Sequence, residues 1–167
     1  YNCTSVICVI RNGNPHVVGE LTELRDTPHV ITTIAEKYDG HRIHIYPDAS
    51  GQSNKTVNAT ESDILLLRRA GFTVHVPSRN PFVKERVMAM GGVICNSMGD
   101  RRLKINAALA PVTTACLEQQ IYDKNGEPDK TEGKDHAPDA LGYLVHFNWP
   151  IVKPTKAHTA PLIHMGR

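Results

Sequence analysis

Two β-branched runs, residues 4–11 and 16–24, are joined by the turn Asn12-Gly13-Asn14-Pro15. An Asn-Gly pair readily adopts the positive φ of a tight turn, so the two runs are predicted to form an antiparallel hairpin. After this hairpin, short β-branched runs alternate with longer segments of helical period. A hairpin followed by alternating strands and helices predicts an α/β fold with a mixed β-sheet.

Local signals place the remaining elements. Asn80 and Asp135 are predicted to cap the helices that follow them, and Glu20 is predicted to be a solvent-facing strand residue. Two helices show inward faces, with Val83, Val87, Met90 and Ile94 on the first and Leu117 and Ile121 on the second. We expect strands over residues 43–46, 72–76 and 102–105, and helices over 29–38, 62–70, 82–96, 111–122 and 136–147.

The length of 167 residues favours one domain. We assign residues 1–150 to that domain and residues 151–167, which are basic and proline-containing, to a flexible tail. No apolar run is long enough to cross a bilayer. The four cysteines form no CxxC pair, so we expect free thiols, with Cys8 and Cys95 buried, and a reducing cytoplasm.

Charge is unevenly distributed along the chain. Residues 118–139 are rich in acids, whereas residues 68–104 are rich in bases. Cations that hold phosphates beside carboxylates that hold metal are what a nuclease needs, although two solvated faces of opposite sign would give the same pattern. The candidate DNA-binding residues are Arg68, Arg69, Arg79, Lys84, Arg86, Arg101, Arg102 and Lys104.

Asp48 stands at the end of the predicted strand 43–46. Pro47 cannot donate a ladder hydrogen bond, so the strand should end there, and the small residues Ala49, Ser50 and Gly51 follow. Ligands of open α/β sheets bind at the carboxyl ends of strands. Asp48 is therefore a candidate site residue, although an aspartate is also a common turn-former after a strand.

A second acidic motif opens the last predicted helix. Asp139 lies three residues after His136 and four after Asp135, so the three side chains share a helix face. If that face meets Asp48, the carboxylates would repel one another unless a cation bridged them, and hard oxygen ligands suit Mg²⁺ or Mn²⁺. Each residue also has an ordinary alternative, as a helix cap, an exposed first-turn residue or an acid favoured by the helix dipole.

Three stretches together resemble the C-terminal nuclease domain of the large terminase subunit of tailed, headful-packaging phages. They are the hairpin ICVIRNGNPHVVGEL, the strand end YPDASG and the helix DHAPDALGYLV, and the resemblance spans residues 7–145. It implies an RNase H-like fold, a mixed sheet flanked by helices. In that family the first strand carries the first acid of a catalytic triad and lies a little upstream of the segment matched by residues 7–10. No acid precedes Glu20 here, so either that strand is absent from the sequence given or another residue substitutes for its acid.

The resemblance also implies roles for individual residues. Asp48 would be the second acid of the triad and Asp139 the third, both binding metal, with His136 a further catalytic position and Asp135 a motif residue of less defined catalytic duty. Two Mg²⁺ or Mn²⁺ ions would serve phosphodiester hydrolysis. No G-x-x-x-x-G-K-[ST] motif occurs, so ATP is not expected to bind this piece.

The function expected from the resemblance is metal-dependent, largely sequence-independent cutting of concatemeric double-stranded DNA during viral genome packaging. The expected partners of the full-length protein are the portal protein and the small terminase subunit. The expected location is the host cell cytoplasm, transiently at the procapsid portal, and not the mature virion or a membrane. Two alternatives remain, a resolvase-type or recombinase-type nuclease of the same fold, and a non-catalytic portal-docking module that uses residues 151–167.

Overall fold

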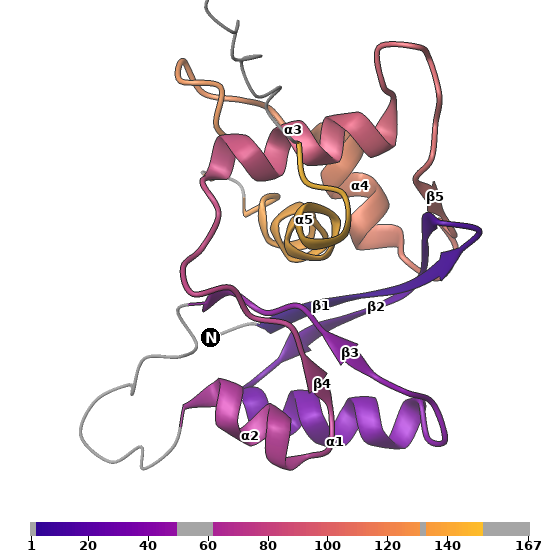
Figure 1. Cartoon of the computed structure of the whole chain (residues 1–167), viewed down its shortest axis with the longest axis vertical. Helices are drawn as coiled ribbons and strands as arrows, with labels where there is room; N and C mark the ends of the chain where they lie inside the picture. Colours follow the sequence, from indigo (N-terminus) through magenta and orange to yellow (C-terminus); the bar gives the residue numbers. More distant parts are fainter. Residues whose placement is uncertain (1–2, 50–61, 131–132, 152–167) are drawn as a thin grey trace, which may run out of the picture.

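The computed structural model of the chain describes residues 3–49, 62–130 and 133–151. The order of elements is the predicted one, a hairpin followed by alternating helices and strands and then two helices (Figure 1). The elements are β1 (Cys3–Arg11), β2 (Asn14–Leu24), α1 (Thr27–Lys37), β3 (His44–Ile45), α2 (Asp63–Arg69), β4 (Thr73–Val74), α3 (Val83–Ile94), β5 (Lys104–Ile105), α4 (Pro111–Gln119) and α5 (His136–Asn148).

The strands of the described residues form two sheets. The first is mixed, with β1 antiparallel to β2 and β2 parallel to β5, in the order β1-β2-β5. Asn12 and Gly13 turn the hairpin with φ of 51° and 74°, as the Asn-Gly signal predicts. The second sheet is the parallel pair β3 and β4. The further strand that the resemblance places in the sheet is not among the described residues.

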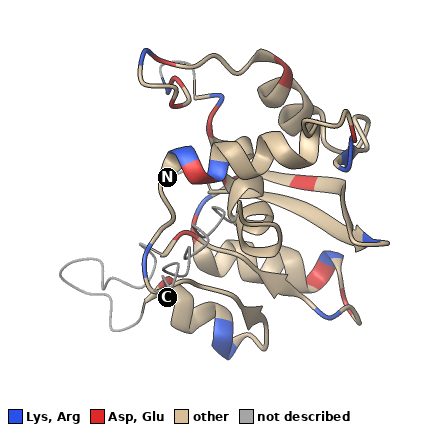
Figure 2. Cartoon of the chain, turned by 45° about the horizontal axis from the view of Figure 1, so that its top comes forward, with Lys and Arg blue, Asp and Glu red and all other residues tan. Residues whose placement is uncertain are grey.

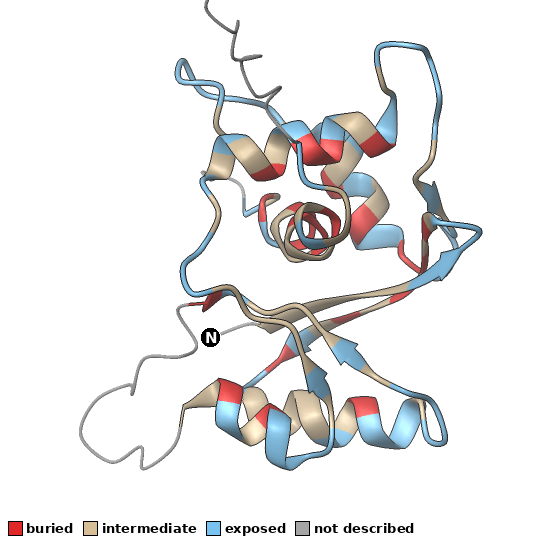
Figure 3. Ribbon diagram, viewed as in Figure 1, coloured by how far each residue is buried: buried red, intermediate tan, exposed pale blue. Residues whose placement is uncertain are grey.

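Helices cover the strands from both sides. Figure 1 shows α3, α4 and α5 on one side of the β1–β2 hairpin and α1 and α2 on the other. The larger core joins the hairpin to the three helices through Val17, Val93, Leu141 and Val145, each at most 1% exposed. A smaller core of Leu21, Leu24 and Ile34 lies against α1, and Figure 3 shows the buried positions facing inward on both sides. The β1–β2 hairpin is therefore packed against helices on both of its faces.

The inward face of α3 differs from the prediction. Its buried residues are Arg86, Ala89, Met90 and Val93, whereas Ile94 is 42% exposed. The buried face of the helix turns Arg86 toward α5, where it packs beside Gly142; a Cβ added at Gly142 would lie in ordinary contact, 3.7 Å from Arg86 Cβ. Helix α4 ends at Gln119, so Ile121 is exposed and its predicted inward placement is wrong.

Several boundaries and exposures also differ from the predictions. Strands β3, β4 and β5 each have two residues, and His44 of β3 is exposed. Proline follows closely after β3 and β4, at Pro47 and Pro77, and ends ladder pairing. All four cysteines are free; Cys8 is partly buried, but Cys95 is exposed, so its predicted burial is wrong. No helix among the described residues is long and apolar enough to cross a membrane.

Candidate functional site

Asp48 leaves β3 at its carboxyl end and meets residues from two other parts of the chain. Its Oδ1 accepts a hydrogen bond of 2.6 Å from Asn80 Nδ2, and its Oδ2 accepts one of 3.1 Å from the Tyr143 hydroxyl. Asn80 follows β4, which runs parallel to β3. Because parallel strands place their carboxyl ends at one edge, Asp48 and Asn80 emerge together.

Asn80 holds the backbone after Asp48 and does not cap a helix. Its Oδ1 accepts a 2.7 Å hydrogen bond from the Ala49 backbone N–H, while its Nδ2 donates to Asp48. The N-cap position of α3 is Phe82, which makes no side-chain capping bond, so the predicted capping role of Asn80 is wrong. The side chain instead ties the two strand ends together, since a neutral amide can donate and accept at once.

Asp139, in the first turn of α5, forms an ion pair with α3. Its Oδ1 lies 3.0 Å from Nη2 of Arg86, and the side chains of Asp139 and Arg86 are 29% and 7% exposed. The guanidinium also donates to the Pro81 carbonyl at 3.3 Å and lies 4.5 Å from the centre of the Tyr143 ring. A buried guanidinium with these neighbours fixes the orientation of the carboxylate.

Tyr143 links the two acids. It lies one helical turn after Asp139 on α5, so the two side chains share a face. Burial raises the pKa of Tyr143 to about 12; Asp48 and Asp139 act in the same direction, and Arg86 opposes them. The phenol therefore stays protonated at neutral pH and can donate to Asp48. We call Asp48, Asn80, Arg86, Asp139 and Tyr143 the carboxylate site.

Asp135 and His136 lie apart from this set of contacts. Asp135 is 6% exposed and makes no side-chain capping bond, so its predicted capping role is wrong. Its backbone is helical, at φ −83° and ψ −22°, which is not the extended conformation typical of a capping residue. The His136 side chain is 65% exposed, with Nδ1 4.0 Å from Asp135 Oδ1.

Glu20, in β2, has a structural role at the start of α4. Its carboxylate accepts three hydrogen bonds from the first turn of α4, from the Val112 N–H at 2.8 Å and from the Thr113 N–H and hydroxyl at 2.7 Å each. This carboxylate of β2 caps the N-terminus of α4, so the predicted solvent-facing role of Glu20 is wrong. Asp135 also acts near α4, because the charges of Glu20 and Asp135 add to burial in raising the pKa of Cys116.

The predicted DNA-binding residues do not form one surface. Figure 2 shows the basic residues in separate places on the ribbon. Arg68 and Arg69 end α2, whereas Lys104 lies in β5, across the fold (Figure 1). Arg86 is buried against Asp139, and Arg102 bonds to Asn14 and to the Gly13 carbonyl. DNA binding by the remaining members, Arg79, Lys84 and Arg101 among them, stays a prediction.

Sequence reasoning missed Tyr143 and Asn80 and misjudged Arg86. Tyr143 could have been found, because it follows Asp139 by four residues in a helix. Asn80 could have been placed from the parallel pairing of the two strands that precede it and Asp48. The Arg86 ion pair had no such signal, because it depends on how α3 and α5 pack.

The donor chemistry of the carboxylate site suits a hard divalent cation, since Asp48 and Asp139 offer carboxylate oxygens. No group of three or more potential metal-ligating His, Cys, Asp or Glu residues occurs within residues 3–49, 62–130 and 133–151. The described acids therefore fit part of a metal site. The Arg86 guanidinium occupies Oδ1 of Asp139, so a metal ion would compete with Arg86 for this carboxylate.

Comparison with known proteins agrees with this geometry. A family model described as "Terminase RNaseH-like domain" matches residues 2–147, and no curated protein matches the chain. The P22 large terminase nuclease domain is a similar solved structure, with a TM-score of 0.59, 13% sequence identity, and coverage of 90% of this chain and 82% of that one. The mixed α/β architecture with five described helices is therefore that of a terminase nuclease domain. The family match covers most of the chain, and the chain belongs to the terminase RNase H-like nuclease family, which implies DNA cleavage during packaging.

Proposed function

We propose that this domain is a metal-dependent endonuclease that cuts concatemeric double-stranded DNA during genome packaging, with Asp48 and Asp139 as two of its metal-binding acids. One observation carries the proposal. Two carboxylates from distant parts of the sequence act on Tyr143: Asp48 accepts a hydrogen bond from its hydroxyl, and the charges of Asp48 and Asp139 both help to raise its pKa. Asp48 is solvent-exposed at the end of its strand. Acids held together in this way are typical of sites that bind cations.

The residues around each acid would prepare it for this task. Asn80 and Tyr143 donate to Asp48 and orient its carboxylate, and Arg86 holds the Asp139 carboxylate. Two Mg²⁺ or Mn²⁺ ions, when bound, would activate water and stabilise the leaving oxygen. We expect a further acidic ligand from outside the described residues, since two carboxylates alone leave most of the coordination positions of such an ion unfilled.

Other features would support cutting without forming part of the acid pair. His136, one helical turn before Asp139 and 65% exposed, could pass a proton to solvent. Exposed arginines and lysines would contact the DNA backbone without reading sequence. The portal protein and the small terminase subunit remain the proposed partners, and the tail assigned to portal docking lies outside the described residues apart from Ile151.

Substitution of the two acids tests the proposal. Asp48→Asn and Asp139→Asn keep the side-chain shape but remove the charge, and each should lower cleavage of plasmid DNA in Mn²⁺ by about a hundredfold or more. The matched control is Asp39→Asn, at an exposed position after α1, which should cleave at the wild-type rate. Wild-type cleavage by either acid variant, with the control intact, would refute the assignment.

The resolvase-type alternative predicts a different substrate preference. A packaging nuclease should cut linear duplex at least as fast as a four-way junction of the same sequence. Cleavage rates on the two DNAs, compared at one salt concentration because backbone contacts are salt-dependent, discriminate between them. A strong preference for the junction would favour the alternative.

A further inference from the structure

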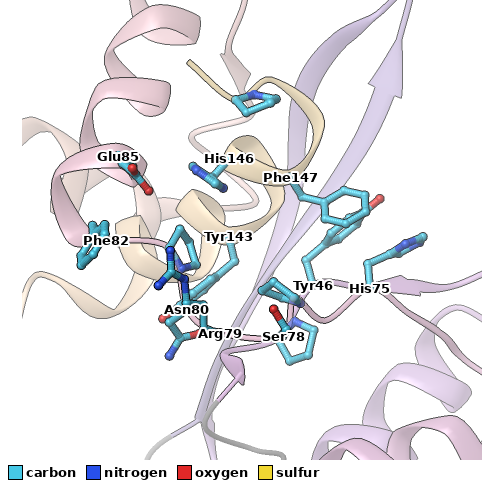
Figure 4. Close-up of a pocket in the computed structure, with 14 residues that line it drawn as sticks. Tyr46, His75, Ser78, Arg79, Asn80, Phe82, Glu85, Tyr143, His146 and Phe147 are labelled. Atoms are coloured by element: carbon cyan, nitrogen blue, oxygen red, sulfur yellow. The ribbon is translucent and has the colours of Figure 1, made fainter. Parts of the chain in front are cut away.

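A cavity of about 410 Å³ opens beside the carboxylate site (Figure 4). It is lined by the loop after β4, the end of β3, the start of α3 and the last turns of α5. Its size lies within the range of clefts that hold small ligands. In Figure 4, Tyr46, His75 and Phe147 gather on one side and Phe82 lies on the other. We call it the aromatic pocket.

One wall of the aromatic pocket is a set of rings already in place. Tyr46 stacks on His75 with centroids 4.7 Å apart and planes 12° apart, and Phe147 leans on both rings at 5.2 and 5.0 Å. The reverse side of this stack is closed by His44, whose ring lies 5.1 Å from that of His75. Burial lowers the pKa of His75, so its ring is neutral at pH 7. This wall offers flat apolar faces with little left to order on binding.

The opposite wall is open and carries charged and polar groups. Phe82 is 66% exposed. The Arg79 guanidinium lies 5.8 Å from the centre of that ring. Among the described residues, the side chains of Ser78 and Glu85 make no hydrogen bond, which leaves a hydroxyl and a carboxylate free for a ligand. The pocket therefore combines ring faces, a cation and free polar groups.

Two residues join the aromatic pocket to the carboxylate site. Asn80 and Tyr143 line the pocket, and both donate to the carboxylate of Asp48. A ligand in the pocket would therefore lie next to Asp48. If the ligand is part of a nucleic acid, the adjoining phosphate would lie between Arg79 and the acids.

We infer that the aromatic pocket binds an unpaired base of the DNA strand being cut, next to the scissile phosphate. A base presents a π-face to Phe82 and Tyr46, and amino groups on its edge can donate to Glu85. Extruding a base from a duplex costs a few kcal/mol, least where the pair is frayed or mismatched. The domain therefore prefers DNA with a frayed or mismatched pair at the cut. This inference rests on the proposed nuclease function.

Base binding can be measured apart from cleavage. The probe is a single-stranded oligonucleotide with one 2-aminopurine, added to the full chain in EDTA so that no cutting occurs. Stacking against the rings should quench the fluorescence of the probe. Phe82→Ala should weaken binding about fivefold or more, since base–aromatic stacking accounts for a large share of such affinity, and Arg79→Gln should weaken it at low salt. Tyr122 is an aromatic ring outside the pocket and is 54% exposed. Tyr122→Ala should therefore leave both the quenching of the probe and its affinity unchanged.

The outcomes separate this inference from the proposed function. Weaker binding by Phe82→Ala with no change in Tyr122→Ala supports the pocket, even if the acid variants still cut DNA. Unchanged probe binding in both Phe82→Ala and Arg79→Gln overturns the inference, even if Asp48→Asn is inactive. Displacement of the probe from the wild-type chain by a proline-rich peptide, but not by unlabelled oligonucleotide, would also overturn it, because a peptide would then be the occupant.

Discussion

Two carboxylate clusters, one at the start of α4 and one at the end of β3, differ in how their acids are held. Near α4, Glu20 receives three hydrogen bonds from the first turn of a helix, two of them from backbone N–H groups. At the end of β3, Asp48 is exposed and receives bonds from the side chains of Asn80 and Tyr143. The first acid completes a helix, whereas the second is presented to solvent.

The same contrast separates Asp135 from Asp139, which are one turn apart in sequence. Asp135 is 6% exposed and its charge helps raise the pKa of Cys116, whereas the Asp139 side chain is 29% exposed and pairs with Arg86. An acid motif on a helix can therefore serve both clusters. Its members are distinguished by the neighbours that packing brings to them, and this distinction can be tested by substitution.

The largest effect on folding should come from Glu20→Gln. The neutral amide keeps one acceptor oxygen but faces the backbone N–H groups of Val112 and Thr113 with a donor, so the free energy of unfolding should fall by about 2–4 kcal/mol. Asp48→Asn, at an exposed site, should change it by less than about 1 kcal/mol. Urea unfolding of the two variants measures both. Equal losses in the two variants would remove the contrast between structural and presented acids.

A smaller loss is expected from Arg86→Met. Methionine fills the space of the alkyl chain but leaves Asp139 without its cation and the Pro81 carbonyl without its donor. Because Asp139 is partly exposed, the cost should be about 1–3 kcal/mol, below that of breaking a fully buried pair. A double-mutant cycle with Asp139→Asn isolates the coupling between the two side chains. A coupling energy near zero would mean that the short contact does not hold Asp139.

The sequence predicted the order of elements, which depends on local period. It also predicted that Asp48 approaches the helix that carries Asp139, and Tyr143 of that helix donates a hydrogen bond to Asp48. It did not predict the roles of Glu20, Asn80 and Asp135. A glutamate in a strand of alternating pattern looks solvent-facing, and only the packing of α4 onto β2 brings Thr113 to it. Asn80 and Asp135 occupy positions where helix caps are common. Asn80 instead bonds to Asp48 and Ala49, and the helical backbone of Asp135 does not suit a cap.

The buried face of α3 could not be predicted from the sequence either. Its apolar positions allow two neighbouring faces to turn inward, and the chosen face places an arginine in the interior. That choice depends on the ion pair between Arg86 and Asp139, which belongs to another helix. Residues 50–61, which follow Ala49, lie outside the described part.

Tyr143→Phe should have a modest effect that depends on pH. The ring beside Arg86 is kept, and only the bond to Asp48 is lost, so about 1 kcal/mol of stability should disappear at neutral pH. Because the pKa of Tyr143 is raised from 10.0 to about 12, the folded state binds this proton more tightly than the unfolded state does. Wild-type stability should therefore fall as pH rises from about 10 to about 12, and the variant should lack that part of the fall. Identical pH profiles in urea unfolding would show that Tyr143 is not perturbed.

The smallest effect should appear at Cys116, which reports on the structural cluster. Its pKa is raised first by burial and then by the charges of Glu20 and Asp135. Removing the Glu20 charge in Glu20→Gln should lower that pKa, so that alkylation of Cys116 by iodoacetamide begins at a lower pH than in the wild type. The exposed Cys95 is the internal control, and mass spectrometry of the labelled peptides resolves the two sites. Asp48→Asn should leave the Cys116 profile unchanged, because Asp48 belongs to the other cluster. A shift of the same size in Asp48→Asn would mean that the Glu20 cluster and the Asp48 cluster are electrostatically coupled.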